Sequence, residues 1–147
     1  MTWTGAISTI EAHLATATSG YQFTVHAGEP GLPAKKTACW FYGGSTDNPE
    51  IAETLTDHPF GELVTVRFYW PVGTRAGTPN RTLELEARAV TRALIGAFEG
   101  DRKLGGNVEA LTIGDAEAGW LNTDNQAWRL VTIPLTLGFT DVESIGE

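Results

Sequence analysis

The hydrophobic positions along the chain follow helical spacing in two segments. In residues 4–18, apolar side chains recur at steps of three and four residues, namely Ile7, Ile10, Leu14 and Ala17. This spacing predicts a short amphipathic helix that ends before Gly20. A longer helix is predicted from Thr78, which precedes Pro79, to Gly100, with an apolar face of Leu83, Ala87, Val90, Leu94 and Phe98. On its outer side Glu84 precedes Arg88 by four residues, a spacing that favours an ion pair.

Five further segments have the alternation or the apolar runs of β-strands: residues 21–26, 37–43, 62–72, 108–114 and 126–139. Polar segments rich in Gly and Pro separate them, including GDAEAGWLNTDN at 114–125, which is expected to be a connection. Pro134 cannot donate a ladder hydrogen bond, so the final strand is expected at a sheet edge or bulged there. The order of elements predicts an α+β domain with both helices packed on one face of a mostly antiparallel sheet.

Composition narrows the class of protein. With 147 residues, 41% of them hydrophobic, the chain 1–147 is expected to form a single domain with one core. The lone Cys39 cannot form an internal disulfide, and the first twenty residues resemble neither a signal peptide nor a membrane span, so we expect an intracellular fold that does not bind membranes. A net charge of −8 opposes binding to phosphate backbones and anionic lipids.

Candidate chemistry is sparse. Cys39 lies in the middle of an apolar strand, where a buried small side chain is the expected role, and the histidines His13, His26 and His58 are scattered over separate elements. Their spacing matches no metal-ligand pattern and brings no base beside a nucleophile. We therefore expect no catalytic residue, no cofactor and no metal site.

The tryptophans indicate contact surfaces. Trp120 lies in the expected polar connection between Gly119 and Asn122, where a large aromatic side chain is a candidate anchor for a partner. Trp128 and Leu130 lie on the less apolar side of the final strand, which suggests a sheet edge or face that another molecule covers. A second copy of the same chain is the simplest cover, and a closed ring of copies leaves no such surface free.

The order of elements resembles that of the tail terminator proteins of long-tailed bacteriophages, related to gpU-like minor tail and neck proteins. The resemblance rests on the short N-terminal helix, the strands CWFYGG and ELVTVRFYW, the helix TLELEARAVTRALIGAF and the closing strand WRLVTIPLTLGF. Together these segments span nearly the whole chain, and the shared feature is an architecture rather than a signature motif.

The resemblance implies a structural virion protein that forms a hexameric ring, caps the tail tube and ends its polymerisation. Its partners would be the tail tube protein and a neck or head-completion protein, and it would be assembled in the host cytoplasm and lie at the head–tail junction. DNA would pass through an acidic lumen without specific binding. From exposure arguments, the candidates for the lumen or ring faces are Asp47, Glu50, Glu53, Asp57 and Arg75, and those for contacts between subunits are Trp120, Trp128 and Leu130.

Three alternatives remain open. A neck stopper, an adaptor or another minor tail protein would have similar sequence features. A small ligand-binding or hydrolytic domain would need polar groups that converge in a pocket. A nucleic-acid-binding module is disfavoured by the negative charge.

Overall fold

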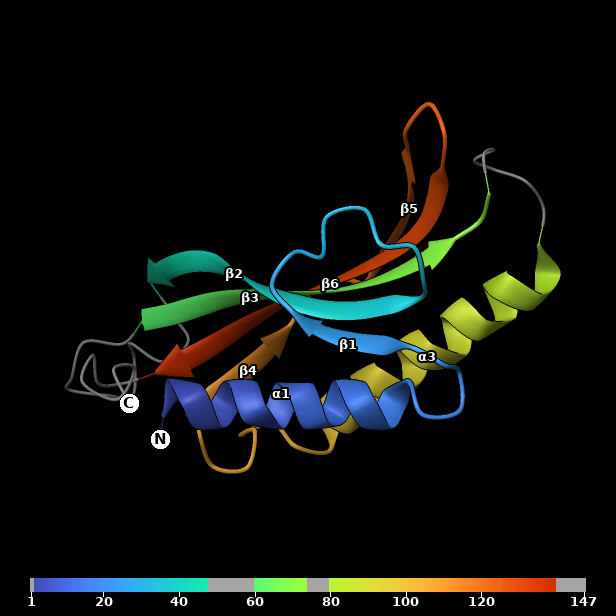
Figure 1. Cartoon of the computed structure of the whole chain (residues 1–147). Coiled ribbons are helices and arrows are strands. Elements are labelled where there is room, and N and C mark those ends of the chain that lie inside the picture. Colours follow the sequence, from blue (N-terminus) through green and yellow to red (C-terminus); the bar gives the residue numbers. More distant parts are fainter. Residues whose placement is uncertain (1, 48–59, 74–79, 140–147) are drawn as a thin grey trace.

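The structure is a computed structural model that describes residues 2–47, 60–73 and 80–139. Its elements are α1 (Trp3–Ala17), β1 (Thr24–Ala27), β2 (Thr37–Asp47), β3 (Phe60–Pro71), α3 (Arg81–Glu99), β4 (Ala110–Ile113), β5 (Glu117–Asn122) and β6 (Ala127–Phe139). Within these ranges the chain forms two helices and a six-stranded, mostly antiparallel sheet, which confirms the predicted α+β class (Figure 1). The segment 114–125 is not only a connection, as predicted, because it contains β5.

The final strand lies inside the sheet. The strand order is β1-β2-β3-β6-β4, and β5 also pairs with β6. Along one side β6 pairs with β3 from Trp128 to Phe139, and along the other it pairs first with β5 and then with β4. The prediction of an edge position was therefore wrong.

Pro134 is tolerated because of where its missing donor lies. Pro134 falls between the β5-paired residues, which end at Thr132, and the β4-paired residues, which begin at Leu135. Its carbonyl oxygen accepts from Gly114 N–H at 2.8 Å, so the same side of Pro134 faces the turn between β4 and β5. Gly114 stands opposite Pro134 by the register of β4 and supplies the one hydrogen bond between them, so the missing proline donor removes at most one ladder bond, just beyond the end of β4.

Side-chain caps fix the start of both helices. The Thr2 hydroxyl accepts from Gly5 N–H at 2.9 Å, and the Asn80 side chain accepts from Leu83 N–H at 3.0 Å. Helix α3 thus begins at Arg81, after the cap at Asn80, whereas the predicted start at Thr78 and Pro79 lies outside the described residues.

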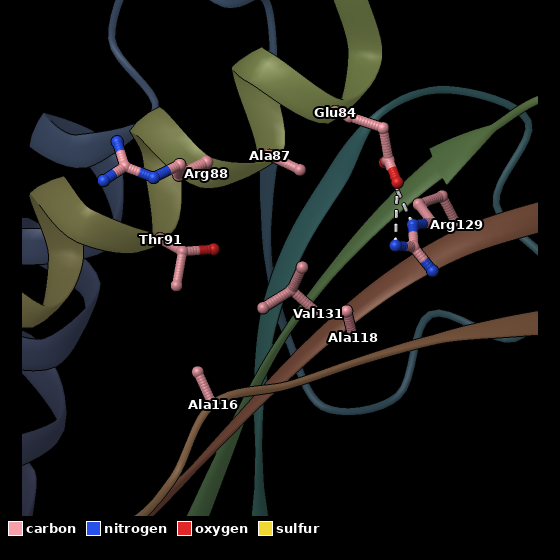
Figure 2. A pocket seen from close by; sticks show the side chains of 8 residues that line it. All are labelled: Glu84, Ala87, Arg88, Thr91, Ala116, Ala118, Arg129 and Val131. Atoms are coloured by element: carbon pink, nitrogen blue, oxygen red, sulfur yellow. Dashed lines mark hydrogen bonds and ion pairs between the residues drawn. The ribbon is translucent and has the colours of Figure 1, made fainter. Parts of the chain in front are cut away.

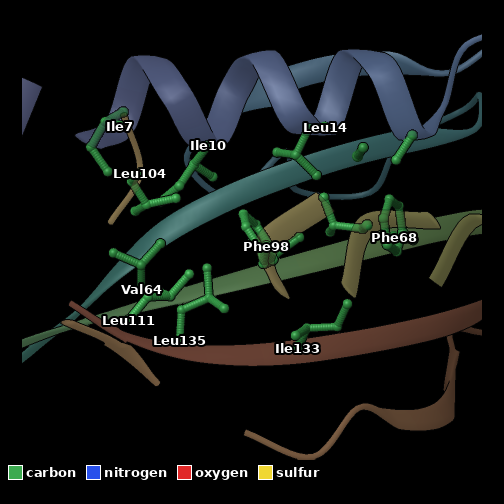
Figure 3. Packing of buried hydrophobic residues seen from close by; sticks show 14 of the residues in the cluster. Ile7, Ile10, Leu14, Val64, Phe68, Phe98, Leu104, Leu111, Ile133 and Leu135 are labelled. Atoms are coloured by element: carbon green, nitrogen blue, oxygen red, sulfur yellow. The ribbon is translucent and has the colours of Figure 1, made fainter. Parts of the chain in front are cut away.

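One large apolar cluster joins the helices to the sheet. It includes residues of both helices and alternate residues of β3 and β6, such as Ile10, Leu14, Phe98, Val64, Phe68, Ile133 and Leu135 (Figure 3). A carboxylate ties α3 to the strands within this region: Glu86 Oε2 accepts from Trp70 Nε1 at 2.8 Å and from Lys36 Nζ at 2.9 Å. The core therefore holds the long helix in a fixed position along the sheet.

A second, smaller cluster is formed by strand residues that alternate with those of the large cluster, so it lies on the opposite face of the sheet. Cys39, Tyr69 and Trp128 are buried there, with Phe41, Leu121 and Leu130 packed against them. The connection between β1 and β2 contacts this cluster, because Trp128 Nε1 donates to Pro33 O at 2.8 Å and the Tyr69 hydroxyl donates to Glu29 Oε2 at 3.0 Å. Arg67 Nη1 also donates to Glu29 Oε1 at 3.3 Å. The chain itself thus covers part of the surface that the sequence suggested a partner would cover.

Candidate functional site

The β5–β6 hairpin projects from the body of the sheet (Figure 1). Its strands are in register from Glu117↔Thr132 to Asn122↔Ala127. The turn is closed by hydrogen bonds between Thr123 and Gln126, with Thr123 N–H donating to the Gln126 carbonyl oxygen at 2.8 Å. Within the described ranges β5 pairs only with β6, so the outer backbone groups of β5 have no strand partner there.

Trp120 and Arg129 face each other across this hairpin. They are directly paired in the register, and the Arg129 guanidinium lies 5.0 Å from the centre of the Trp120 ring. Trp120 remains 37% exposed, which is unusual for so large an apolar side chain in a strand. The tryptophan is therefore held in a defined orientation and still available to a partner.

The same arginine ties the hairpin to α3. Arg129 Nη2 and Nε donate to the two carboxylate oxygens of Glu84 at 2.8 and 3.1 Å, a bidentate pair (Figure 2). Arg129 Nη1 also donates to Gly119 O at 3.2 Å. Glu84 thus pairs with Arg129 and not with Arg88, the partner that its helical spacing favours. The pairing fixes the hairpin relative to the helix.

A pocket of about 260 Å³ lies between α3 and the hairpin. Its lining combines apolar side chains with a few polar and charged ones (Figure 2). The apolar residues are Ala87, Ala116, Ala118 and Val131, and the polar or charged ones are Glu84, Arg88, Thr91 and Arg129. Thr91 Oγ1 is buried and has no hydrogen-bond partner among the described residues. A buried hydroxyl without a partner is destabilising, so a polar group that enters the pocket would gain a hydrogen bond there.

The residues expected at subunit contacts divide into two groups. Trp120 is exposed on β5, but Trp128 is only 3% exposed and Leu130 packs beside it in the smaller cluster. The pattern of β6 does not reveal this cover, because it comes from the connection between β1 and β2, which is distant from β6 in the sequence. The missed residues are Arg129, Glu84 and Thr91, whose role arises from contact between elements distant in the sequence.

The residues expected at the lumen or ring faces are mostly outside the described part of the chain. Asp47 is the last residue of β2. Glu50, Glu53, Asp57 and Arg75 lie outside the described ranges, as does His58.

The groups considered for chemistry are dispersed. Burial raises the pKa of the Cys39 thiol to about 12, and His26 Nδ1 lies 3.4 Å from Gly28 O. His13 Nε2 lies 2.9 Å from Asp101 Oδ2. The pKa of the Asp101 carboxyl is lowered, chiefly by the hydrogen bond from Gly105 N–H and to a smaller extent by the hydrogen bond with His13. Among the residues that the structure describes, no three His, Cys, Asp or Glu side chains gather as a metal site would require. Neither described helix has the length and hydropathy of a membrane span.

Comparison with known proteins finds structural likeness only. No family model matches the chain, and no curated protein matches it in sequence. One solved structure that it resembles is a sheath/tube terminator of an extracellular contractile injection system, PVC, in the extended state. The two chains share 11% identity with a TM-score of 0.41, over 99% of this chain and 60% of the other. This chain thus spans about 60% of the length of that protein, and a likeness of this size does not by itself assign a function.

Proposed function

We propose that the chain is a structural subunit of the tail terminator type, which forms a ring on the end of a tail tube, stops its polymerisation and joins it to the neck while DNA passes through. The likeness of the sequence to the tail terminators of long-tailed phages suggests this role and a ring of six. Catalysis has no part in it.

The projecting β5–β6 hairpin is the observation that carries the proposal. It presents an exposed Trp120, an unpaired β5 edge among the described residues and a pocket beside α3. A protruding element and a separate recess on one subunit are suited to a head-to-tail contact, in which the hairpin of one copy enters the recess of the next. Such contacts form a closed ring when the rotation angle between neighbouring copies is a whole fraction of 360°. We infer that Trp120 of each copy contacts its neighbour.

The charge of the chain suits a conduit for DNA. A net charge of −8 denies phosphate groups the clustered cations that they bind, so DNA would slide past such subunits without being held. In this proposal the acidic residues Asp47, Glu50, Glu53 and Asp57 are assigned to the lumen or to the ring faces.

Replacement of Trp120 tests the contact between subunits. Trp120→Glu removes the exposed ring and places a carboxylate opposite Arg129, which preserves an attractive pair within the hairpin. We expect self-association to weaken by at least about tenfold, as for a central aromatic residue of an interface. Native mass spectrometry and light scattering of the wild type and the variant measure the change.

Leu32→Glu is the matched control. Leu32 is 62% exposed on the connection between β1 and β2, and its replacement introduces the same charge elsewhere. It should leave the oligomer intact. A wild-type chain that stays monomeric at high concentration, alone and with tube protein, would contradict the proposal.

Tube assembly separates a terminator from its closest alternative. A terminator added to polymerising tube subunits should shorten the tubes seen by electron microscopy, and Trp120→Glu should restore their length. If the chain instead leaves tube length unchanged and binds the portal side of the neck, it is a stopper or adaptor.

A further inference from the structure

A second pocket lies on the chain, away from the hairpin. It is lined by Trp3 at the start of α1, Trp40 and Tyr42 of β2 and Glu62 of β3, and its volume is about 530 Å³. The rings of Trp3 and Tyr42 meet edge to face, with centroids 5.7 Å apart and planes at 83°. Tyr42 is 52% exposed, so the pocket is open to solvent. Three aromatic side chains and one carboxylate therefore surround a space that an external group can enter.

Local backbone structure builds this pocket. Trp40 and Tyr42 are two residues apart on β2 and so lie on the same face of the strand. The register with β3 shifts between Tyr42 and Gly44, and Gly44 has a φ of 104°, which only glycine adopts readily. Such a bulge changes the direction of the side chains beside it and is common next to binding sites.

The carboxylate of the pocket, Glu62, has no ion-pair partner in the part of the chain that the structure describes. Glu62 is 4% exposed, and its Oε1 accepts from Ser45 Oγ at 2.7 Å, which in turn lies 2.9 Å from the Tyr42 hydroxyl. Glu11 Oε2 accepts from Nε1 of Trp40, which also lines the pocket, at 3.0 Å. The ion pairs of the described residues involve His13, Lys36, Arg67 and Arg129, and none includes Glu62 or Glu11.

The stretch of sequence that leads from Tyr42 to Glu62 adds negative charge only. Residues 43–62 contain five acidic residues and no Lys or Arg. A carboxylate removed from water is costly unless a cation pairs with it, and the faces of Trp and Tyr rings also attract cations. The aromatic rings and the carboxylate thus favour the same kind of ligand.

We propose that this pocket binds an arginine side chain presented by a partner protein. A guanidinium group is planar, stacks on aromatic rings and donates in a fork that suits a carboxylate, whereas an ammonium group offers a single strongly hydrated charge. The open rim suits a side chain that enters from another surface. The proposal does not depend on ring formation or on a tail tube, because it rests on this pocket alone.

Titration with a blocked amino acid tests the chemistry. The indole N–H signals of the ¹⁵N-labelled protein are followed by nuclear magnetic resonance as N-acetyl-arginine amide is added. We expect the signals of Trp3 and Trp40 to shift and saturate, while those of the buried Trp70 and Trp128 stay in place. N-acetyl-citrulline amide has nearly the same shape without the charge and should cause no saturable shift.

Two variants locate the charge that is required. Glu62→Gln keeps an acceptor for Ser45 and removes the charge, and we expect it to weaken arginine binding by about tenfold or more, as loss of one partner of a charge pair does. Glu117→Gln removes an exposed carboxylate on the distant hairpin and should bind as the wild type does. Circular dichroism and the thermal midpoint establish that each variant is folded.

The alternative results overturn the proposal. If the citrulline and arginine derivatives shift the same signals equally, the pocket binds the aliphatic part of the side chain that they share and not the cationic group. If arginine causes no shift of Trp3 and Trp40, or if Glu62→Gln binds unchanged, the assignment fails. Should Glu62→Gln not fold, Tyr42→Leu takes its place, because the Tyr42 ring lines the pocket and is exposed; a weakened affinity is expected, and an unchanged one contradicts the proposal.

Discussion

Cys39 shows how strongly a single site depends on its surroundings. Its side chain is fully buried in the smaller cluster with Tyr69 and Trp128, and burial, followed by the nearby Glu29 carboxylate, raises its thiol pKa from 9.0 to about 12. At neutral pH the thiol is therefore protonated and unreactive, since the thiolate is the nucleophile. Its role is that of a small apolar side chain in the smaller cluster.

This gives a prediction for thiol labelling. At pH 8 the folded protein should react with a disulfide reagent at least about a thousandfold more slowly than the unfolded chain, because the raised pKa lowers the thiolate fraction by that factor. The absorbance of released thionitrobenzoate, with and without denaturant, measures the two rates. Rapid labelling of the folded protein would show that the site opens or that the thiol is not buried.

At this scale the sequence distinguishes exposed from buried residues only in part. Trp120 and Trp128 both belong to the β5–β6 hairpin, and pattern alone made both contact candidates. Trp120 is exposed as expected, whereas Trp128 is covered because its indole donates to Pro33 O from a connection 95 residues earlier. Contacts of that kind depend on the path of the whole chain, which local periodicity does not contain.

Two elements approach each other closely at the turn between β4 and β5. A Cβ atom added at Gly114 would lie 2.6 Å from Pro134 Cγ and 3.2 Å from Pro134 O. The proline ring cannot move away without disturbing β6, which is paired on both sides. Gly114 is thus required by the close approach of the two backbones.

We therefore expect Gly114→Ala to lower the free energy of unfolding by about 1 to 3 kcal/mol, the usual cost of overpacking. Gly119→Ala is the control, since a Cβ there meets nothing within 4 Å, and it should be neutral or slightly stabilising. Urea denaturation followed by tryptophan fluorescence measures both. Equal stability of the two variants would mean that the turn relaxes at no cost.

Elements with strong periodicity were predictable, and those defined by pairing were not. Residues 4–18 and the apolar face through Phe98 gave both helices within a few residues, because a single amphipathic face specifies a helix. β5, with the sequence EAGWLN, has little alternation and contains glycine and asparagine, so its strand exists through its register with β6. Pro134 also misled, because strand pairing is not visible in the local sequence: the proline indicated an edge strand, but it lies in a central strand between the residues paired with β5 and those paired with β4.

Over the whole molecule the excess of acidic groups governs which polymers it can contact. The net charge is −8, and three of the four ion pairs of the described residues already engage a Lys or Arg. The ten Lys and Arg residues are outnumbered by 18 Asp and Glu residues, so the net field of the molecule opposes contact with a phosphate backbone. The order of helices and strands could be inferred from the sequence, but the placement of the exposed groups could not, because the projecting hairpin and its pocket arise from tertiary contacts.

A DNA-mobility experiment checks this. Double-stranded DNA mixed with the protein at about 0.15 M salt should migrate as free DNA, because like charges repel and no counterions are released. Lowering the salt should make no difference. A shift that strengthens as salt is lowered would revive a nucleic-acid-binding function.

The pairing of β3 with β6 also determines when the protein can acquire its fold during synthesis. Phe60 lies opposite Phe139, and the residues between them form α3, β4 and β5. In a nascent chain that has left the ribosome only as far as residue 126, β3 can pair with β2 along one edge, but its other edge has no partner because β6 is not yet available. The apolar faces of the two helices then lack the β6 side chains against which they pack. Contacts between residues so distant in the sequence slow folding and leave intermediates with exposed apolar surface. Newly made chains therefore avoid aggregation only if synthesis is completed quickly or if chaperones cover that surface.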